Sequence, residues 1–170
     1  MLSVTQILRL AGMMPEGPWY TEEARDRGKA THWACRYAAE DDLDTTDLDP
    51  VVLERVQNFQ RWRAEMRPEI LAWEEEVHGD GYVGHVDLRV RLNGDEGIID
   101  IKPAPADWHP LQLMFYAAAY DRPMLRWNLY LGGPNYKLVQ RKDRDIRIAR
   151  AALVVAQWRI DHGLSDDNPA

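Results

Sequence analysis

Cysteine is almost absent from this sequence, and long hydrophobic segments are missing altogether. A single cysteine, Cys35, among 170 residues excludes an intramolecular disulfide framework and any zinc or iron–sulfur site that takes four thiolates from this chain. No segment approaches the roughly 20 apolar residues of a membrane-spanning helix. The first residues carry Arg9 within their apolar stretch and lack the layout of a signal peptide. These absences predict a soluble, cytoplasmic protein with no membrane partner.

Positive charge is also scarce, because 21 Lys and Arg residues face 28 Asp and Glu residues, for a net charge of −7. A protein that coats nucleic acid is normally basic, so this balance argues against that class. An enzyme that acts on nucleic acid is still allowed, since net charge does not report the local field. Much of the acidity lies in segments 40–49 and 161–170, which predict a solvated loop and a frayed end, with a flexible tail over 163–170.

The pattern of apolar residues and breakers predicts one mixed α/β domain over residues 1–170. Capping residues and helical periodicity predict helices over 4–11, 21–40, 51–68, 109–120 and about 143–162. The last helix is expected to turn Ile146, Ile148, Leu153, Val154 and Trp158 largely inward. Strands are predicted over 70–78, 82–92 and 97–102, and a second hairpin turns through 132–135. The result is a sheet of about five strands with helices on its faces.

Two acidic residues interrupt strands that otherwise belong in a core. Alternation over 82–92 places Val86, Leu88 and Val90 on an apolar face and Asp87 on the polar one, and Asn93-Gly94 predicts a tight turn into the next strand. Asp100 and Lys102 share one face of that strand, because residues i and i+2 point the same way.

The hairpin can therefore bring Asp87, Asp100 and Lys102 together. Two close carboxylates repel unless a cation neutralises them, and Mg²⁺ or Mn²⁺ prefers such oxygen ligands. The lysine could then activate a water or stabilise charge on a phosphate. The alternative is a surface hairpin with an exposed Asp87–Lys102 ion pair, worth about 0–1 kcal/mol.

Neighbouring segments add candidate residues to this hairpin. Gln112 and Tyr116 lie one helical turn apart, where they could hold a phosphate backbone, stack on bases or be the polar tips of a packed helix. His32 is either a ligand or an ordinary packed histidine. Of the glutamates at 74–76, Glu74 and Glu76 share a strand face, so at most part of this run serves a site.

Taken in order, these segments resemble the RecB-like branch of the PD-(D/E)XK nuclease superfamily, including its small phage and Cas4-type exonucleases. The resemblance covers residues 3 to 120 and rests on the ordered motifs SVTQIL, GKATH with His32, EEE at 74–76, GHVD with Asp87, IIDIK with Asp100 and Lys102, and QLMFY with Gln112 and Tyr116. It implies a restriction-endonuclease-like core.

The resemblance also implies a role for each residue. Asp87, Asp100 and the carbonyl of Ile101 would bind Mg²⁺ or Mn²⁺, with His32 and Glu74 as further ligands and Glu76 as the fallback for Glu74. Lys102 would position or activate the water, while Gln112 and Tyr116 would contact DNA or steady the site. With only one cysteine, no iron–sulfur cluster of the Cas4 type is expected.

The implied function is a metal-dependent DNA exonuclease of phage-type recombination or repair, working in a bacterial host cell. It would act alone, as a homo-oligomer or with a phage recombination partner protein. The alternatives are a non-catalytic nuclease-fold subunit that binds DNA or protein, and a purely structural domain.

Two features depart from the family pattern. Lys102 is followed by PAPADWHP rather than the common threonine-glycine, and the acidic net charge leaves the DNA groove unexplained. The basic residues available to build a groove are Arg61, Arg63, Arg67, Arg89, Arg91, Lys137, Arg141 and Lys142.

Overall fold

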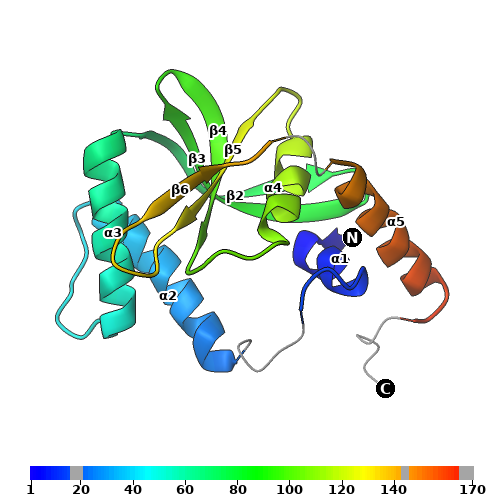
Figure 1. Cartoon of the computed structure of the whole chain (residues 1–170), viewed down its shortest axis with the longest axis horizontal. Helices are drawn as coiled ribbons and strands as arrows, with labels where there is room; N and C mark the ends of the chain where they lie inside the picture. Colours follow the sequence, from blue (N-terminus) through cyan, green and yellow to red (C-terminus); the bar gives the residue numbers. More distant parts are fainter. Residues whose placement is uncertain (16–20, 143–145, 165–170) are drawn as a thin grey trace.

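A six-stranded mixed sheet with helices on both faces forms the body of the protein in this computed structural model, which describes residues 1–15, 21–142 and 146–164 (Figure 1). The elements in chain order are β1 (Leu2–Ser3), α1 (Val4–Leu10), α2 (Glu22–Ala39), α3 (Pro50–Met66), β2 (Glu69–Gly79), β3 (Tyr82–Leu92), β4 (Asp95–Lys102), α4 (His109–Ala118), β5 (Leu125–Tyr130), β6 (Lys137–Gln140) and α5 (Ile146–Asp161). The mixed α/β class is confirmed, with six strands instead of about five because the two-residue β1 was not predicted.

Strand β3 organises the sheet. Strand β2 pairs with it antiparallel along one edge, and the other edge is divided between β1 at Tyr82 and Val83 and β4 at 88–92. The sheet continues through β5, parallel to β4, and ends with β6, antiparallel to β5. The middle of β3 therefore has a stretch of edge that neither β1 nor β4 covers.

Local chemistry explains where several elements begin and turn. Ser3 and Gln6 form a reciprocal capping box at the start of α1, and Asp49 caps α3 ahead of Pro50. Asn93 and Gly94 have φ angles of 51° and 93°, the left-handed pair that a tight I′ hairpin turn requires. The predicted β3–β4 hairpin is thus confirmed.

The sheet separates two hydrophobic cores. Helices α1, α4 and α5 pack on one face, around Ile7, Leu113 and Ile98, while α2 and α3 pack on the other, around Cys35, Phe59 and Ile99 (Figure 1). The middle of the sheet is thereby covered on both faces, while part of the β2–β3 ribbon stays exposed, at Glu76, His78 and His85.

Helix α5 buries a narrower face than the one expected. Of the five residues expected to point largely inward, Ile146 and Leu153 pack against the core, whereas Ile148, Val154 and Trp158 are 47%, 68% and 53% exposed. Ala149, Ala152 and Ala156 face the core instead. Small side chains let α5 approach the neighbouring helices closely, and apolar periodicity alone does not distinguish an alanine stripe from a stripe of larger residues. The expected start of this helix, at Asp143, lies outside the described residues.

Strand β3 changes faces at Asp87, which corrects the expected alternation. Val86 belongs to the core under α1, α4 and α5, whereas Leu88 and Val90 belong to the core under α2 and α3. The β2 residue opposite Asp87 is Glu74, bracketed by the Trp73–Leu88 and Glu75–Val86 pairs, and its φ angle is +48°. This local irregularity turns Asp87 away from the solvent-facing side that strict alternation predicted.

Among the described residues, no helix is long and apolar enough to span a membrane. The single-domain assignment of residues 1–170 stays a prediction. Of the predicted flexible tail, 165–170 lies outside the described residues.

Candidate active site

Asp87 lies where β3 and β4 separate. The pairing between these strands ends at Leu88 and Ile99, and the amide of Ile101, two residues further along β4, donates to Asp87 Oδ2 at 2.6 Å. The carboxylate thus takes the place of a strand carbonyl, and Asp87 is only 7% exposed. The alternative of an exposed Asp87–Lys102 ion pair is therefore wrong, since Lys102 pairs with Asp100.

Asp100 is buried on β4 between a cation and an amide. Lys102 Nζ lies 2.9 Å from Asp100 Oδ1, as expected for two residues on one strand face, and the Asn128 amide donates to Asp100 Oδ2 at 3.0 Å. Burial raises the pKa of Asp100, Lys102 opposes this effect, and the nearby Asp87 charge adds to it. A divalent cation bound nearby would add a second positive charge to that of Lys102 and would hold the buried Asp100 carboxylate in its charged form.

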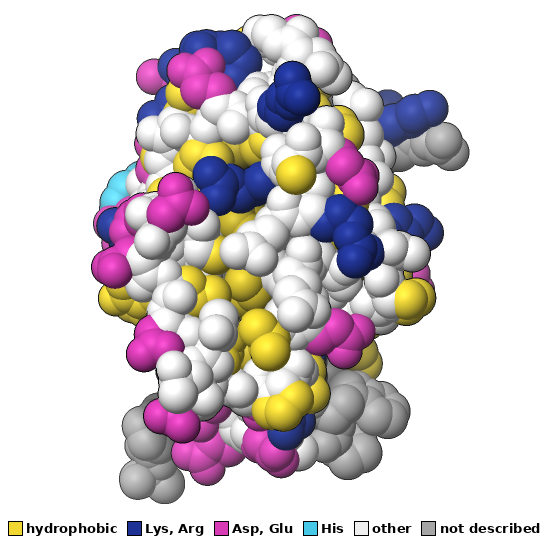
Figure 2. All heavy atoms as spheres, turned by 90° about the vertical axis from the view of Figure 1, so that its left-hand side faces the viewer, with side chains coloured by type: hydrophobic (Ala, Val, Ile, Leu, Met, Phe, Trp, Pro, Cys, Tyr) yellow, Lys and Arg dark blue, Asp and Glu magenta, His cyan; other side chains and the backbone are white. Residues whose placement is uncertain are grey.

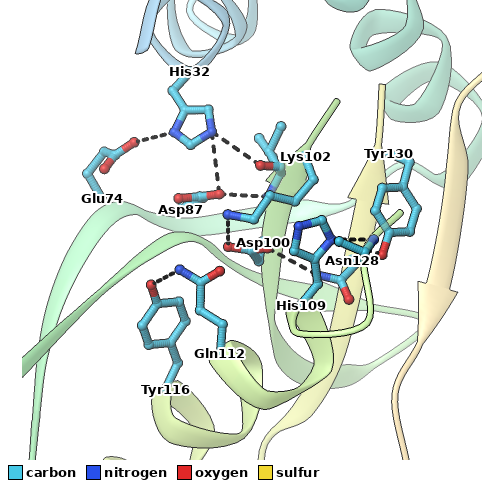
Figure 3. A network of polar contacts seen from close by, with 12 residues as sticks. His32, Glu74, Asp87, Asp100, Lys102, His109, Gln112, Tyr116, Asn128 and Tyr130 are labelled. Atoms are coloured by element: carbon cyan, nitrogen blue, oxygen red, sulfur yellow. Dashed lines mark hydrogen bonds and ion pairs between the residues drawn. The ribbon is translucent and has the colours of Figure 1, made fainter. Parts of the chain in front are cut away.

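His32 projects from α2 toward these strands and contacts Glu74, Asp87 and Ile101 (Figure 3). Its Nδ1 lies 3.3 Å from Glu74 Oε1, and its Nε2 lies 3.6 Å from Asp87 Oδ2 and 3.3 Å from the Ile101 carbonyl oxygen. Glu76 instead contacts His78 and His85 on the exposed side of the β2–β3 ribbon. The geometry therefore brings Glu74, and not Glu76, to His32.

The imidazole of His32 is the positive partner of this cluster. Burial on its own lowers the pKa of His32, but the Asp87 carboxylate and the hydrogen bond to Glu74 outweigh burial and raise the pKa to about 9. His32 is consequently an imidazolium at neutral pH, and it places one positive charge between two carboxylates.

These residues fit a divalent cation. Ligand atoms of His32, Glu74 and Asp87 lie within 4.8 Å of one another, and the Ile101 carbonyl oxygen is beside His32 Nε2. Mn²⁺ accepts one imidazole nitrogen together with oxygen ligands, and Mg²⁺ would be bound through the oxygen atoms. His32 can bind a cation only through an unprotonated ring nitrogen. A cation must therefore displace a proton from the imidazolium.

Gln112 and Tyr116 contact each other on α4. Both are 5% exposed, and Gln112 Nε2 donates to the Tyr116 hydroxyl at 2.6 Å (Figure 3). The buried Gln112 Oε1 has no hydrogen-bond partner among the described residues. Both side chains therefore belong to a packed face of α4, which agrees with the packed-helix alternative, and their role in a site stays a prediction.

Asn128 was not among the predicted site residues. It is completely buried on β5, directly opposite Asp100 on β4, and its Oδ1 accepts from Arg141 Nε at 2.7 Å. Since the arginine can only donate, the Asn128 amide group must point at Asp100. The signal was present: Asn128 interrupts the apolar strand LRWNLY just as Asp100 interrupts IIDIK.

The network continues from Arg141 into the PAPADWHP segment. Arg141 Nη2 donates to the Tyr130 hydroxyl at 2.6 Å, and that hydroxyl lies 3.3 Å from His109 Nδ1. Burial lowers the pKa of His109 to about 3, helped by the positive charges of Lys102 and Arg141. His109 therefore stays neutral, and its Nδ1 accepts from the amide of Ala106 at 3.2 Å.

The unusual loop after Lys102 thus has a structural role. The ring of Trp108 lies 5.6 Å from Lys102 Nζ, a cation–π distance. Trp108 is 8% exposed, so the loop places an apolar wall beside the ammonium group. The Trp108 ring therefore restricts the positions that the Lys102 ammonium group can take.

Several of the basic residues expected to line a groove are engaged in separate local contacts. Arg63 donates to the Ala38 carbonyl, Arg89 pairs with Glu75 and Glu96, and Arg91 pairs with Glu69. On the face in Figure 2, acidic and basic side chains are interspersed, and hydrophobic side chains run between them. These contacts do not support a single basic groove built from that set.

Comparison with known proteins identifies the fold. No family model matches the sequence, and no curated protein matches it. Among solved structures, an alkaline exonuclease from Laribacter hongkongensis is similar, with a TM-score of 0.50 and 12% identity over 96% of this chain and 89% of that chain. The structure of that enzyme in complex with dAMP gives a TM-score of 0.50 and 10% identity over the same shares. Neither supports a Cas4-like branch in particular, and the likeness shows that this chain has a nuclease fold.

Proposed function

We propose that this protein is a metal-dependent DNA nuclease, and most simply an exonuclease. The observation that carries the proposal is the convergence of His32, Glu74 and Asp87 beside the buried Asp100–Lys102 pair, where β3 and β4 separate. The fold likeness to an alkaline exonuclease, also solved with dAMP, supports the same chemistry.

A Mg²⁺ or Mn²⁺ ion at this position would supply positive charge for phosphate oxygens and lower the pKa of a water. In this proposal the ligands are His32, Glu74, Asp87, Asp100 and the Ile101 carbonyl. The bond from the Ile101 amide fixes the Asp87 carboxylate, and Asn128 does the same for Asp100.

Lys102 supplies the second positive charge of the site. Its ammonium group is held between Asp100 and the ring of Trp108, so it can orient a water or stabilise charge that develops on the phosphate. Gln112 bonds to Tyr116 within α4, and the Tyr116 ring packs close to Gly84 of β3, so this pair would steady the helix beneath the site.

We also propose that the protein belongs to the RecB-like branch and acts in phage recombination or repair, which the order of motifs favours. Assembly into a homo-oligomer, or with a phage recombination partner protein, is compatible with this role. Both proposals depend on the nuclease chemistry that the fold and the site geometry support.

The experiment incubates the purified protein with linear duplex, circular duplex and single-stranded DNA, with Mg²⁺, Mn²⁺ or EDTA. We expect linear DNA to be degraded in the presence of either metal and to survive in EDTA. Lys102→Ala and Asp100→Asn should each reduce the rate by about 10²- to 10⁴-fold. The exposed Arg147→Ala, which removes a positive charge from α5, is the control and should retain the wild-type rate.

Circular dichroism and thermal melting of each variant separate loss of chemistry from loss of fold. Full activity of a folded Lys102→Ala protein would contradict the proposal. DNA binding in EDTA without cleavage under any metal would support the non-catalytic alternative.

A further inference from the structure

Two large aromatic side chains lie exposed on α2 directly after His32. Trp33 is 56% exposed and Tyr37 is 41% exposed. Their ring centroids are 6.3 Å apart and their planes are inclined by 27°, so the two rings stack. Leaving both rings in water forgoes apolar burial, which makes them candidates for contact with a ligand.

Helix geometry connects this pair to the site. Each residue turns the helix by about 100°, so Arg36 and Lys29 lie about 40° and 60° from His32, with Trp33 and Tyr37 beyond them on the same side. The opposite side of His32 carries Ala34, Cys35 and Ala38, which are buried in the core. Lys29, Trp33, Arg36 and Tyr37 therefore form one continuous strip, the α2 strip, that begins at the candidate metal ligand.

The two cations of the strip are accessible to a ligand. Lys29 is exposed and Arg36 is half-buried. Arg36 also pairs with Glu40 at 3.1 Å, an exposed contact between residues four apart that opens at little cost. Both cations of the strip are thus available to phosphates that approach His32.

We propose that the α2 strip binds unpaired nucleotides of the strand that enters the active site. Bases stack on aromatic faces whatever their sequence, and interleaved cations contact the phosphates between them. The inference rests on the proposed nuclease function and specifies its substrate as DNA with a single-stranded end or frayed terminus.

The test measures the affinity of the full-length protein for a fluorescein-labelled single-stranded oligonucleotide of about 12 nucleotides in EDTA. Fluorescence anisotropy should show binding by the wild type that weakens about 10- to 100-fold in the Trp33→Ala/Tyr37→Ala double variant, because both stacking faces are lost. Trp33→Phe keeps an aromatic face and should retain most of the affinity.

Trp158→Ala is the matched control. Trp158 is 53% exposed on α5 and stacks on His162 with ring centroids 4.4 Å apart, so this variant also loses an exposed, stacked ring. The affinity of Trp158→Ala for the oligonucleotide should equal that of the wild type. Equal losses in Trp158→Ala and the double variant, or no wild-type binding, would overturn the inference.

Cleavage assays with Mn²⁺ keep the two proposals distinguishable. The double variant should raise KM for a duplex with a single-stranded overhang more than it lowers kcat. If the wild type cleaves DNA while the double variant binds the oligonucleotide normally, the nuclease proposal stands, the strip proposal fails, and the rings belong to a protein contact. If the oligonucleotide binds through the strip but no DNA is cleaved, only the nuclease proposal fails.

Discussion

At the scale of single residues, the positive charge of His32 balances the negative charges of the candidate site. Its imidazolium lies between Glu74 and Asp87, as a cation would, and its Nε2 also reaches the Ile101 carbonyl. The proton on this ring and a divalent cation therefore compete for the same position. Such competition makes both stability and metal affinity depend on pH.

Without metal, wild-type stability should fall as the pH rises from about 6.5 to about 9, the window between the ordinary pKa of histidine and its value here. The folded state holds the proton more tightly, so the stabilisation is fully present below pH 6.5 and is lost as the pH passes 9. One proton limits the slope to about 1.4 kcal/mol per pH unit. Urea unfolding in EDTA, compared with His32→Gln, measures this contribution.

His32→Gln keeps a hydrogen-bonding side chain but does not titrate, so its unfolding free energy should be flatter over this window. Parallel pH curves for the two proteins would mean that His32 is not held as an imidazolium between Glu74 and Asp87.

At the scale of elements, the approach of α4 to β3 depends on Gly84. A Cβ atom at this position would lie 2.6 Å from Cδ1 and Cε1 of the Tyr116 ring. Tyr116 is buried and bonded to Gln112, so it has little room to move. The glycine of the GHVD motif is thus explained by close packing beneath the site.

Gly84→Ala should destabilise the fold by about 1–3 kcal/mol, since it overpacks a closed contact, and should lower nuclease activity by displacing Tyr116. Gly28→Ala is the control, because Gly28 lies within α2 and a Cβ atom there would meet no neighbouring side chain of the described residues within 4 Å. That change should stabilise the protein by about 0.5–1 kcal/mol. Chemical denaturation of both variants tests the pair, and equal effects would rule out the Tyr116 contact as the cause.

At the scale of the whole molecule, the candidate ligands join segments that are distant in sequence. His32 comes from α2, Glu74 from β2, and Asp87 and Asp100 from β3 and β4 (Figure 1). A bound cation would hold the α2 layer against the sheet, and it would bind the folded state alone because the unfolded chain does not assemble these ligands.

Mn²⁺ should therefore raise the melting temperature, with a stabilisation of about 2.7 kcal/mol at a concentration 100-fold above Kd. Asp87→Asn keeps an acceptor for the Ile101 amide but removes the charge, so it should lose most of this increment. His85→Ala alters the exposed contact with Glu76 and should keep it. Differential scanning calorimetry measures the rise in melting temperature for each variant. If Mn²⁺ stabilised Asp87→Asn but not His85→Ala, the metal would bind at the exposed β2–β3 ribbon and not at Asp87.

Much of the architecture could be predicted because it depends on local rules. Capping residues predicted the helix starts, Asn93-Gly94 predicted the hairpin, and alternation placed Asp100 and Lys102 on one face. The inward face of α5 was predicted only in part, because periodicity cannot show whether a helix approaches its neighbours through alanines or through larger residues.

The sequence by itself determined which ionisable residues interrupt buried strands, and in what order. Only the tertiary structure decided which of them meet. The irregularity at Glu74 and Asp87 turns β3 toward His32, and the parallel pairing of β4 with β5 brings Asn128 to Asp100. Strand register and helix docking are set by long-range packing, so contacts between residues far apart in the chain follow from the assembled sheet and not from local sequence.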